Sequence, residues 1–187
     1  MVVDEIKKIA WLNIENDEDL ETLLKEGENR INKSFDGWTP LQNAVIYKRL
    51  KAVLALLKAG AKHDVTDDEG KTPLHYACED GNAEIAGALL EADADVNTKD
   101  MFGSTPIFGA IFSENYKLLL KLIEAGANVN CKDVNGITPL HFASYQNDWI
   151  AVSILLHKGA DKTAVDGRGN RPADLAADEE VKKLFAL

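Results

Sequence analysis

The sequence lacks the features that would assign it to a membrane-spanning, secreted or disulfide-stabilised class. No apolar run approaches the roughly 18 residues of a membrane-spanning helix, and charged residues interrupt positions 1–17, where a signal peptide would lie. The 2 cysteines, Cys78 and Cys131, are too few for a disulfide framework. We therefore expect a reduced, cytoplasmic protein without membrane insertion, although export without a cleaved signal is compatible with the same absences.

Clustered basic residues are also lacking. The chain has 21 Lys and Arg against 31 Asp and Glu, a net charge of −10, and residues 67–99 alone carry −7. A surface that binds phosphates needs concentrated positive charge, so we expect no nucleic-acid partner. The acid excess has two interpretations: it keeps the chain soluble, or it adds a selective negative element to a binding surface.

Catalytic and metal-binding motifs are missing as well. No G-x-S-x-G motif is present, and the glycine pair around Arg168 lacks the lysine of a phosphate-binding loop. His75 and His141 occupy identical Thr-Pro-Leu-His tetrapeptides, which favours a scaffold role because metal ligands must converge. His63 and His157 have no partner at ligand spacing. We expect no catalysis, no cofactor and no metal.

What the sequence does contain is a repeat with a period of 33 residues. Each repeat pairs a turn with a helix start: in the clearest copy, 67–70 is an acidic turn ending in glycine, Thr72 is an N-cap and Pro73 takes the first helical position. A fixed period of this size predicts a stacked array of structural repeats. The dipeptides that mark the period are Thr39-Pro40, Thr72-Pro73, Thr105-Pro106 and Thr138-Pro139, with Arg171-Pro172 in the fifth place.

With the tetrapeptides at His75 and His141, and Gly-Ala pairs beginning at Gly60, Gly126 and Gly159, the chain resembles the ankyrin repeat family. The resemblance covers the chain almost end to end. It implies an all-α solenoid of helix-turn-helix repeats joined by β-hairpin-like loops, forming one domain over residues 1–187. The implied repeats are an N-terminal cap (1–33), four central repeats (34–66, 67–99, 100–132 and 133–165) and a C-terminal cap (166–187).

The repeat pattern is broken in three ways. Asp93 stands where other repeats end their second helix with glycine, so the register predicts a positive φ at an aspartate. Lys48 and Glu114 occupy the slot of Gly81, at the end of the first helix, and 62–64 replaces the usual loop ending. In the second repeat we expect helices over 40–47 and 50–59.

Some positions are not fixed by the repeat pattern, and the residues at these positions suggest where a partner binds. The family resemblance places the turn tips and the outer faces of the first helices on one concave surface, and aromatic residues and methionine are enriched at interface centres. The alternative is that the repeats pack differently and bury some of these side chains. The predicted partner-binding residues are Phe35, Trp38, Tyr47, Asp68, Glu69, Glu79, Asp80, Met101, Phe102, Phe112, Ile137 and Tyr145, with Val134 on the same face.

Asn97 and Asn130 allow two interpretations. They resemble the ankyrin hairpin asparagine that a dioxygenase hydroxylates, and they also suit hydrogen bonds that tie one loop to the next, which we favour.

The sequence therefore predicts a non-catalytic protein-recognition module, monomeric on its own, that binds a partner protein of unknown identity. Two other functions remain open. An inhibitor or immunity-type protein that occludes a partner enzyme would bind one-to-one and abolish an activity. An architectural or chaperone subunit of a larger assembly would co-purify in constant stoichiometry.

Overall fold

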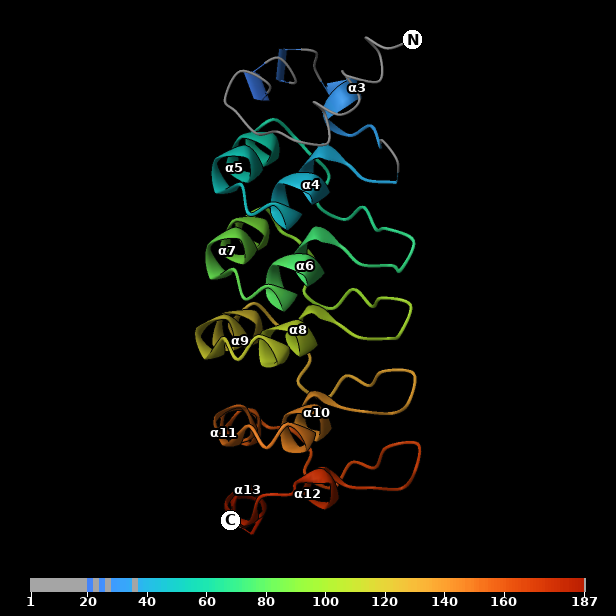
Figure 1. The fold of residues 1–187 in the computed structure, drawn as a ribbon, viewed down its shortest axis with the longest axis vertical. Helices are drawn as coiled ribbons and strands as arrows, with labels where there is room; N and C mark the ends of the chain where they lie inside the picture. Colours follow the sequence, from blue (N-terminus) through green and yellow to red (C-terminus); the bar gives the residue numbers. More distant parts are fainter. Residues whose placement is uncertain (1–19, 22–23, 26–27, 35–36, 187) are drawn as a thin grey trace. The chain divides into compact units, whose positions relative to one another are not determined.

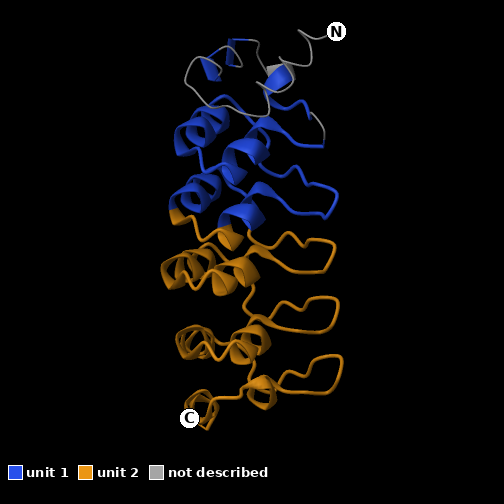
Figure 2. Ribbon diagram, viewed as in Figure 1, with its two compact units in different colours: residues 1–77, 84–95 blue, residues 78–83, 96–187 orange. Residues whose placement is uncertain are grey.

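The computed structural model describes residues 20–21, 24–25, 28–34 and 37–186, so most of the predicted N-terminal cap lies outside the described residues. Within that part of the chain the elements are short α-helices and no β-strand is among them. The all-α prediction is confirmed. The chain divides into two compact units, shown in Figure 2: unit 1 comprises residues 1–77 and 84–95, and unit 2 comprises residues 78–83 and 96–187.

The first helix of a repeat begins where the Thr-Pro pair predicts. The Thr39 hydroxyl accepts the Gln42 N–H at 3.2 Å, and the Gln42 side chain accepts the Thr39 N–H at 2.8 Å, which completes a capping box. Proline follows at the first helical position, where no N–H is needed. The helices predicted over 40–47 and 50–59 are observed as α4 (Pro40–Ile46) and α5 (Leu50–Lys58), each one residue shorter.

In unit 1, the short α3 (Glu28–Ile31) precedes the packed pair of α4 and α5. Figure 1 shows α4 beside the protruding loops and α5 in a second layer away from them. The next repeat follows with α6 (Pro73–Glu79) and α7 (Ala83–Glu91), most of which belongs to the same unit.

Unit 2 holds three helix pairs with the same arrangement. Helix α10 packs on α8 and α12, and α11 packs on α9 and α13, so first helices form one layer and second helices another (Figure 1). The core between the layers contains fully buried Ile107, Leu118, Leu122 and Leu155, and burying each such side chain contributes about 1.5–3 kcal/mol. The helices are α8 (Pro106–Phe112), α9 (Tyr116–Glu124), α10 (Pro139–Tyr145), α11 (Trp149–His157), α12 (Pro172–Leu175) and α13 (Glu179–Leu184).

The loops before α6, α8, α10 and α12 are turns, each organised by one aspartate, and we call these turns fingers: 67–71 in unit 1, and 100–104, 133–137 and 166–170 in unit 2. In the second finger of unit 2, the Asp133 carboxylate accepts the N–H groups of Asn135 and Ile137, both at 2.8 Å. Asp67, Asp100 and Asp166 accept the equivalent pair of N–H groups at 2.8–2.9 Å. Each aspartate binds the amides of the residues two and four positions after it. This interaction explains why an aspartate recurs at the start of each turn.

The fingers of unit 2 are joined by backbone hydrogen bonds. Val134 N–H donates to the Phe102 carbonyl at 2.9 Å, and Gly167 N–H donates to the Asn135 carbonyl at 2.7 Å. A Cβ atom at Gly167 would lie 2.9 Å from that same carbonyl oxygen, so only glycine permits the close approach. Neighbouring fingers therefore form one rigid edge of unit 2.

The predicted positive φ at Asp93 is confirmed. Its φ is 64°, while Gly60, Gly126 and Gly159 in the same slot have 87°, 93° and 85°. A non-glycine residue adopts this conformation only at a cost, which is smaller for aspartate than for most residues.

Replacing Asp93 with glycine should therefore stabilise the protein by about 0.5–1 kcal/mol, because relief of strain outweighs the greater flexibility of glycine in the unfolded chain. Urea unfolding measures the change. The matched control, Gly126→Asp, should destabilise by a similar amount. A loss of stability in Asp93→Gly would mean that the aspartate makes a specific capping contact.

Candidate protein-binding surface

On its fingers and first helices, unit 2 displays five large apolar side chains that are between 50% and 70% exposed. Three lie on fingers and two lie at the ends of the neighbouring first helices α8 and α10. Solvated turns are normally polar, and contiguous exposed apolar side chains on a folded domain usually mark a recognition surface. We call this set the apolar strip: Met101, Phe102, Phe112, Val134 and Tyr145.

Next to the strip, a groove of about 800 Å³ runs between the last two fingers and helices α10 and α12. Phe142 lines the groove and packs against the buried Phe108 ring, with centroids 5.8 Å apart. The predicted binding residue Ile137 is half-buried in this wall. The apolar lining consists of Val134, Ile137, Phe142, Tyr145 and Leu175.

In the two fingers that line the groove, the aspartate carboxylates accept hydrogen bonds from their own turns. The Asn170 side chain donates to Asp166 at 3.0 Å, and this bond, with the backbone N–H groups of Asn170 and Arg168, lowers the pKa of Asp166. The turn's stabilisation is therefore present above the ordinary pKa of an aspartate and is lost as the pH falls through the lowered value. At neutral pH Asp166 therefore stabilises the last finger.

The predicted acidic residues Glu79 and Asp80 lie at the other end of the strip. Both belong to unit 2, where the Ser113 hydroxyl donates to the Cys78 carbonyl at 3.0 Å. A Cβ on Gly109 would lie only 2.7 Å from the Glu79 backbone nitrogen, so the end of α6 packs directly on α8. The acids are therefore close to Phe112, with Glu79 half-buried and Asp80 exposed.

The other predicted contact residues belong to unit 1. Trp38 is half-buried because its ring packs edge-on against Tyr76, with centroids 5.6 Å apart. This agrees with the alternative interpretation, in which packing of the repeats buries some of the predicted contact residues. Tyr47, Asp68 and Glu69 are exposed. Phe35 lies outside the described residues.

Asn97 and Asn130 tie successive loops together. The Asn97 side chain donates to the Gly126 carbonyl at 3.1 Å and accepts the Asn128 N–H at 2.8 Å. Asn130 makes the equivalent bonds to Gly159 and Asp161. This geometry agrees with the hydrogen-bonding interpretation, and hydroxylation of either residue stays a prediction.

Sequence reasoning missed a third member of this set. Asn32 donates to the Gly60 carbonyl at 3.3 Å and accepts the Lys62 N–H at 2.7 Å, both within unit 1. Asn32 lies one position later than the 33-residue period places it, which is why counting by period did not find it.

The histidines of the tetrapeptides are structural. In both repeats the ring Nδ1 accepts the N–H of the capping threonine, at 3.1 Å for His75 and 3.3 Å for His141. His141 Nε2 also contacts the Asn170 carbonyl at 3.0 Å, so the ring joins α10 to the last finger. Among the described residues, no cluster of three or more His, Cys, Asp or Glu side chains suits a metal ion.

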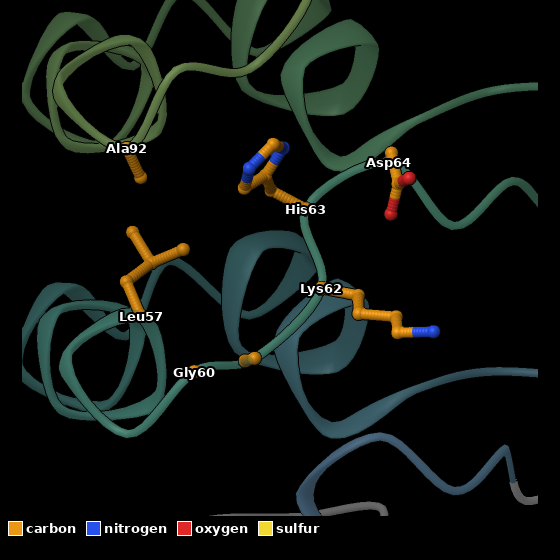
Figure 3. A pocket seen from close by; sticks show the side chains of 7 residues that line it. Leu57, Gly60, Lys62, His63, Asp64 and Ala92 are labelled. Atoms are coloured by element: carbon orange, nitrogen blue, oxygen red, sulfur yellow. The ribbon is translucent and has the colours of Figure 1, made fainter.

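His63 borders a separate hollow of about 500 Å³ in unit 1. Figure 3 shows its ring near Leu57 and Ala92, while Lys62 and Asp64 point to the other side of the loop. The ring Nδ1 is buried without a hydrogen-bond partner. The other lining residues are Gly60, Ala61, Lys62 and Asp64, in addition to Leu57 and Ala92.

The two thiols are also poor candidates for chemistry. Both cysteines are free and buried, and burial raises the pKa of each thiol. A nucleophilic cysteine needs the thiolate, which this burial disfavours.

Comparisons with known proteins agree with the repeat pattern. A family model described as ankyrin repeats (3 copies) matches residues 8–100, and a model described as ankyrin repeats (many copies) matches residues 122–176. No curated protein matches the chain. In the described part of the chain, no helix is both long and apolar enough to cross a membrane.

The different surroundings of Trp38 and Tyr145 predict different costs of truncation. Tyr145→Ala should change the free energy of unfolding by at most about 0.5 kcal/mol, as expected for an exposed side chain. Trp38→Ala should cost about 1–3 kcal/mol, because it removes the ring contact with Tyr76 and part of a buried surface. Thermal or urea unfolding separates the two. Equal losses would show that Tyr145 is packed and is not available to a partner.

Proposed function

Because the chain belongs to the ankyrin repeat family, whose repeats are generally protein–protein interaction modules, we propose that it is a non-catalytic module that binds a partner protein through the apolar strip and the groove of unit 2. The observation that carries the proposal is the exposure of five large apolar side chains on the fingers and first helices. Exposed Tyr47, Asp68 and Glu69 form a separate set of proposed contact residues within unit 1.

The surface suits binding because it is already ordered. Backbone bonds join the fingers at Phe102 to Val134 and at Asn135 to Gly167, and each finger is held by its own aspartate. A preformed surface loses little conformational entropy on association, so more of the apolar burial is available for affinity. Tyr145 and Phe102 are the natural anchors, since aromatic residues dominate binding hot spots.

The direct test is a quantitative pull-down with the Phe102→Ala/Tyr145→Ala variant. Proteins captured by the wild-type chain should be lost, because truncating an anchor typically costs about 2 kcal/mol or more of binding free energy. Circular dichroism and unfolding should show an intact fold.

Trp149→Ala is the matched control. Trp149 is an exposed aromatic residue at the start of α11, in the layer of second helices. Its truncation should leave capture unchanged. Capture that survives the double variant but fails with Trp149→Ala would place the binding surface on the second helices and contradict the proposal.

Glu79 and Asp80 should act on the rate of association. If they face basic groups of the partner, reversing both to lysine should slow association and reduce its dependence on salt, because such charges steer encounter. Stopped-flow or surface-based kinetics at two salt concentrations measure both effects. Rates that do not change with the reversal would assign the acids to solubility alone.

A further inference from the structure

Arg168 is the charged side chain of the groove that its surroundings leave without a counter-ion. It lies in the last finger, it is exposed, and it lines the groove beside the apolar strip. It makes no ion pair with any described residue. Arg171, three positions later, differs because it pairs with Asp174 at 3.3 Å.

The two aspartates and the histidine of the described groove lining already have hydrogen-bond partners. Asp133 and Asp166 each accept two backbone N–H groups of their own finger, and Asp166 also binds the Asn170 amide. The His141 ring contacts Thr138 on one side and the Asn170 carbonyl on the other. An incoming chain therefore meets apolar side chains, two carboxylates already bound to their own turns, and the guanidinium of Arg168.

We propose that the bound partner segment is an apolar peptide that presents a carboxylate, from Asp, Glu or a chain terminus, to Arg168. This inference rests on the proposed function. A guanidinium matches a carboxylate with two parallel N–H donors, which adds geometric specificity to the attraction of opposite charges.

Charge distribution limits the rest of the segment. The chain carries −10 overall, so a strongly acidic partner would be repelled. Glu79 and Asp80 lie beyond the opposite end of the strip, near Phe112. The partner segment that fits unit 2 is therefore apolar in the middle, acidic at the end that meets Arg168 and neutral or basic at the end that meets the acids.

The experiment selects a phage-displayed library of random linear peptides on the full chain. Three variants are selected in parallel: Arg168→Glu, Tyr145→Ala and Lys117→Glu. The last is the matched control, because it makes the same change of charge at an exposed lysine in the first turn of α9, outside the groove.

We expect the wild type and Lys117→Glu to enrich peptides in which an acidic residue accompanies large apolar residues. Arg168→Glu should instead enrich peptides with Lys or Arg at the acidic position. For one resynthesised peptide, Arg168→Glu and reversal of the peptide's acid should each weaken binding by roughly 3- to 10-fold, and combining them should restore much of the affinity.

Two results would overturn the inference, and they differ in what they imply for the proposed function. Peptides that are lost with Tyr145→Ala but bind Arg168→Glu equally well would reject the carboxylate and leave the proposed surface standing. Peptides that are insensitive to both variants, or a library with no enrichment over Tyr145→Ala, would count against the carboxylate and the surface together.

Discussion

The fingers depend on one interaction, the aspartate carboxylate that accepts two backbone N–H groups of its own turn. In unit 2 it occurs at Asp100, Asp133 and Asp166. It fixes the turn without any contribution from the side chains at the turn tip. The fold of the turn therefore does not depend on the side chains at its tip, among them Met101 and Phe102. The same bonds turn the aspartate carboxylates toward the backbone of their own turns, while Met101, Phe102 and Val134 of the fingers are exposed.

That arrangement explains why exposed apolar residues and a stable fold coexist. The core of unit 2 is supplied by the second-helix stripe, such as Leu118 and Leu122, and by the small residues that let first helices approach, such as Gly109. Phe112 and Tyr145 contribute little to it because both point from helix ends into solvent. Exposed apolar side chains lower the solubility of a protein. The proposed binding of a partner would bury these side chains.

The 33-residue period was sufficient to predict the helices, their Thr-Pro starts and the positive φ of Asp93, because all three follow from local backbone chemistry. Exposure was harder to predict. Trp38 and Tyr145 looked alike in the sequence, yet Trp38 is half-buried because Tyr76 happens to pack on it. The role of Asn32 could not be predicted because Asn32 lies one residue out of register. The lack of an ion pair at Arg168 could not be predicted either, because it depends on which carboxylates accept hydrogen bonds from the fingers. Such features depend on which residues are neighbours in the folded structure. The repeat period alone does not contain that information.

The central claim, that the fingers and first-helix ends of unit 2 contact a partner protein, is tested most directly by hydrogen exchange of the chain alone and in complex with a captured partner. The account predicts slower exchange in residues 100–104 and 133–137 and around Phe112 and Tyr145, where a bound segment would cover the backbone. Protection confined to α9 and α11, with the fingers unchanged, would contradict it.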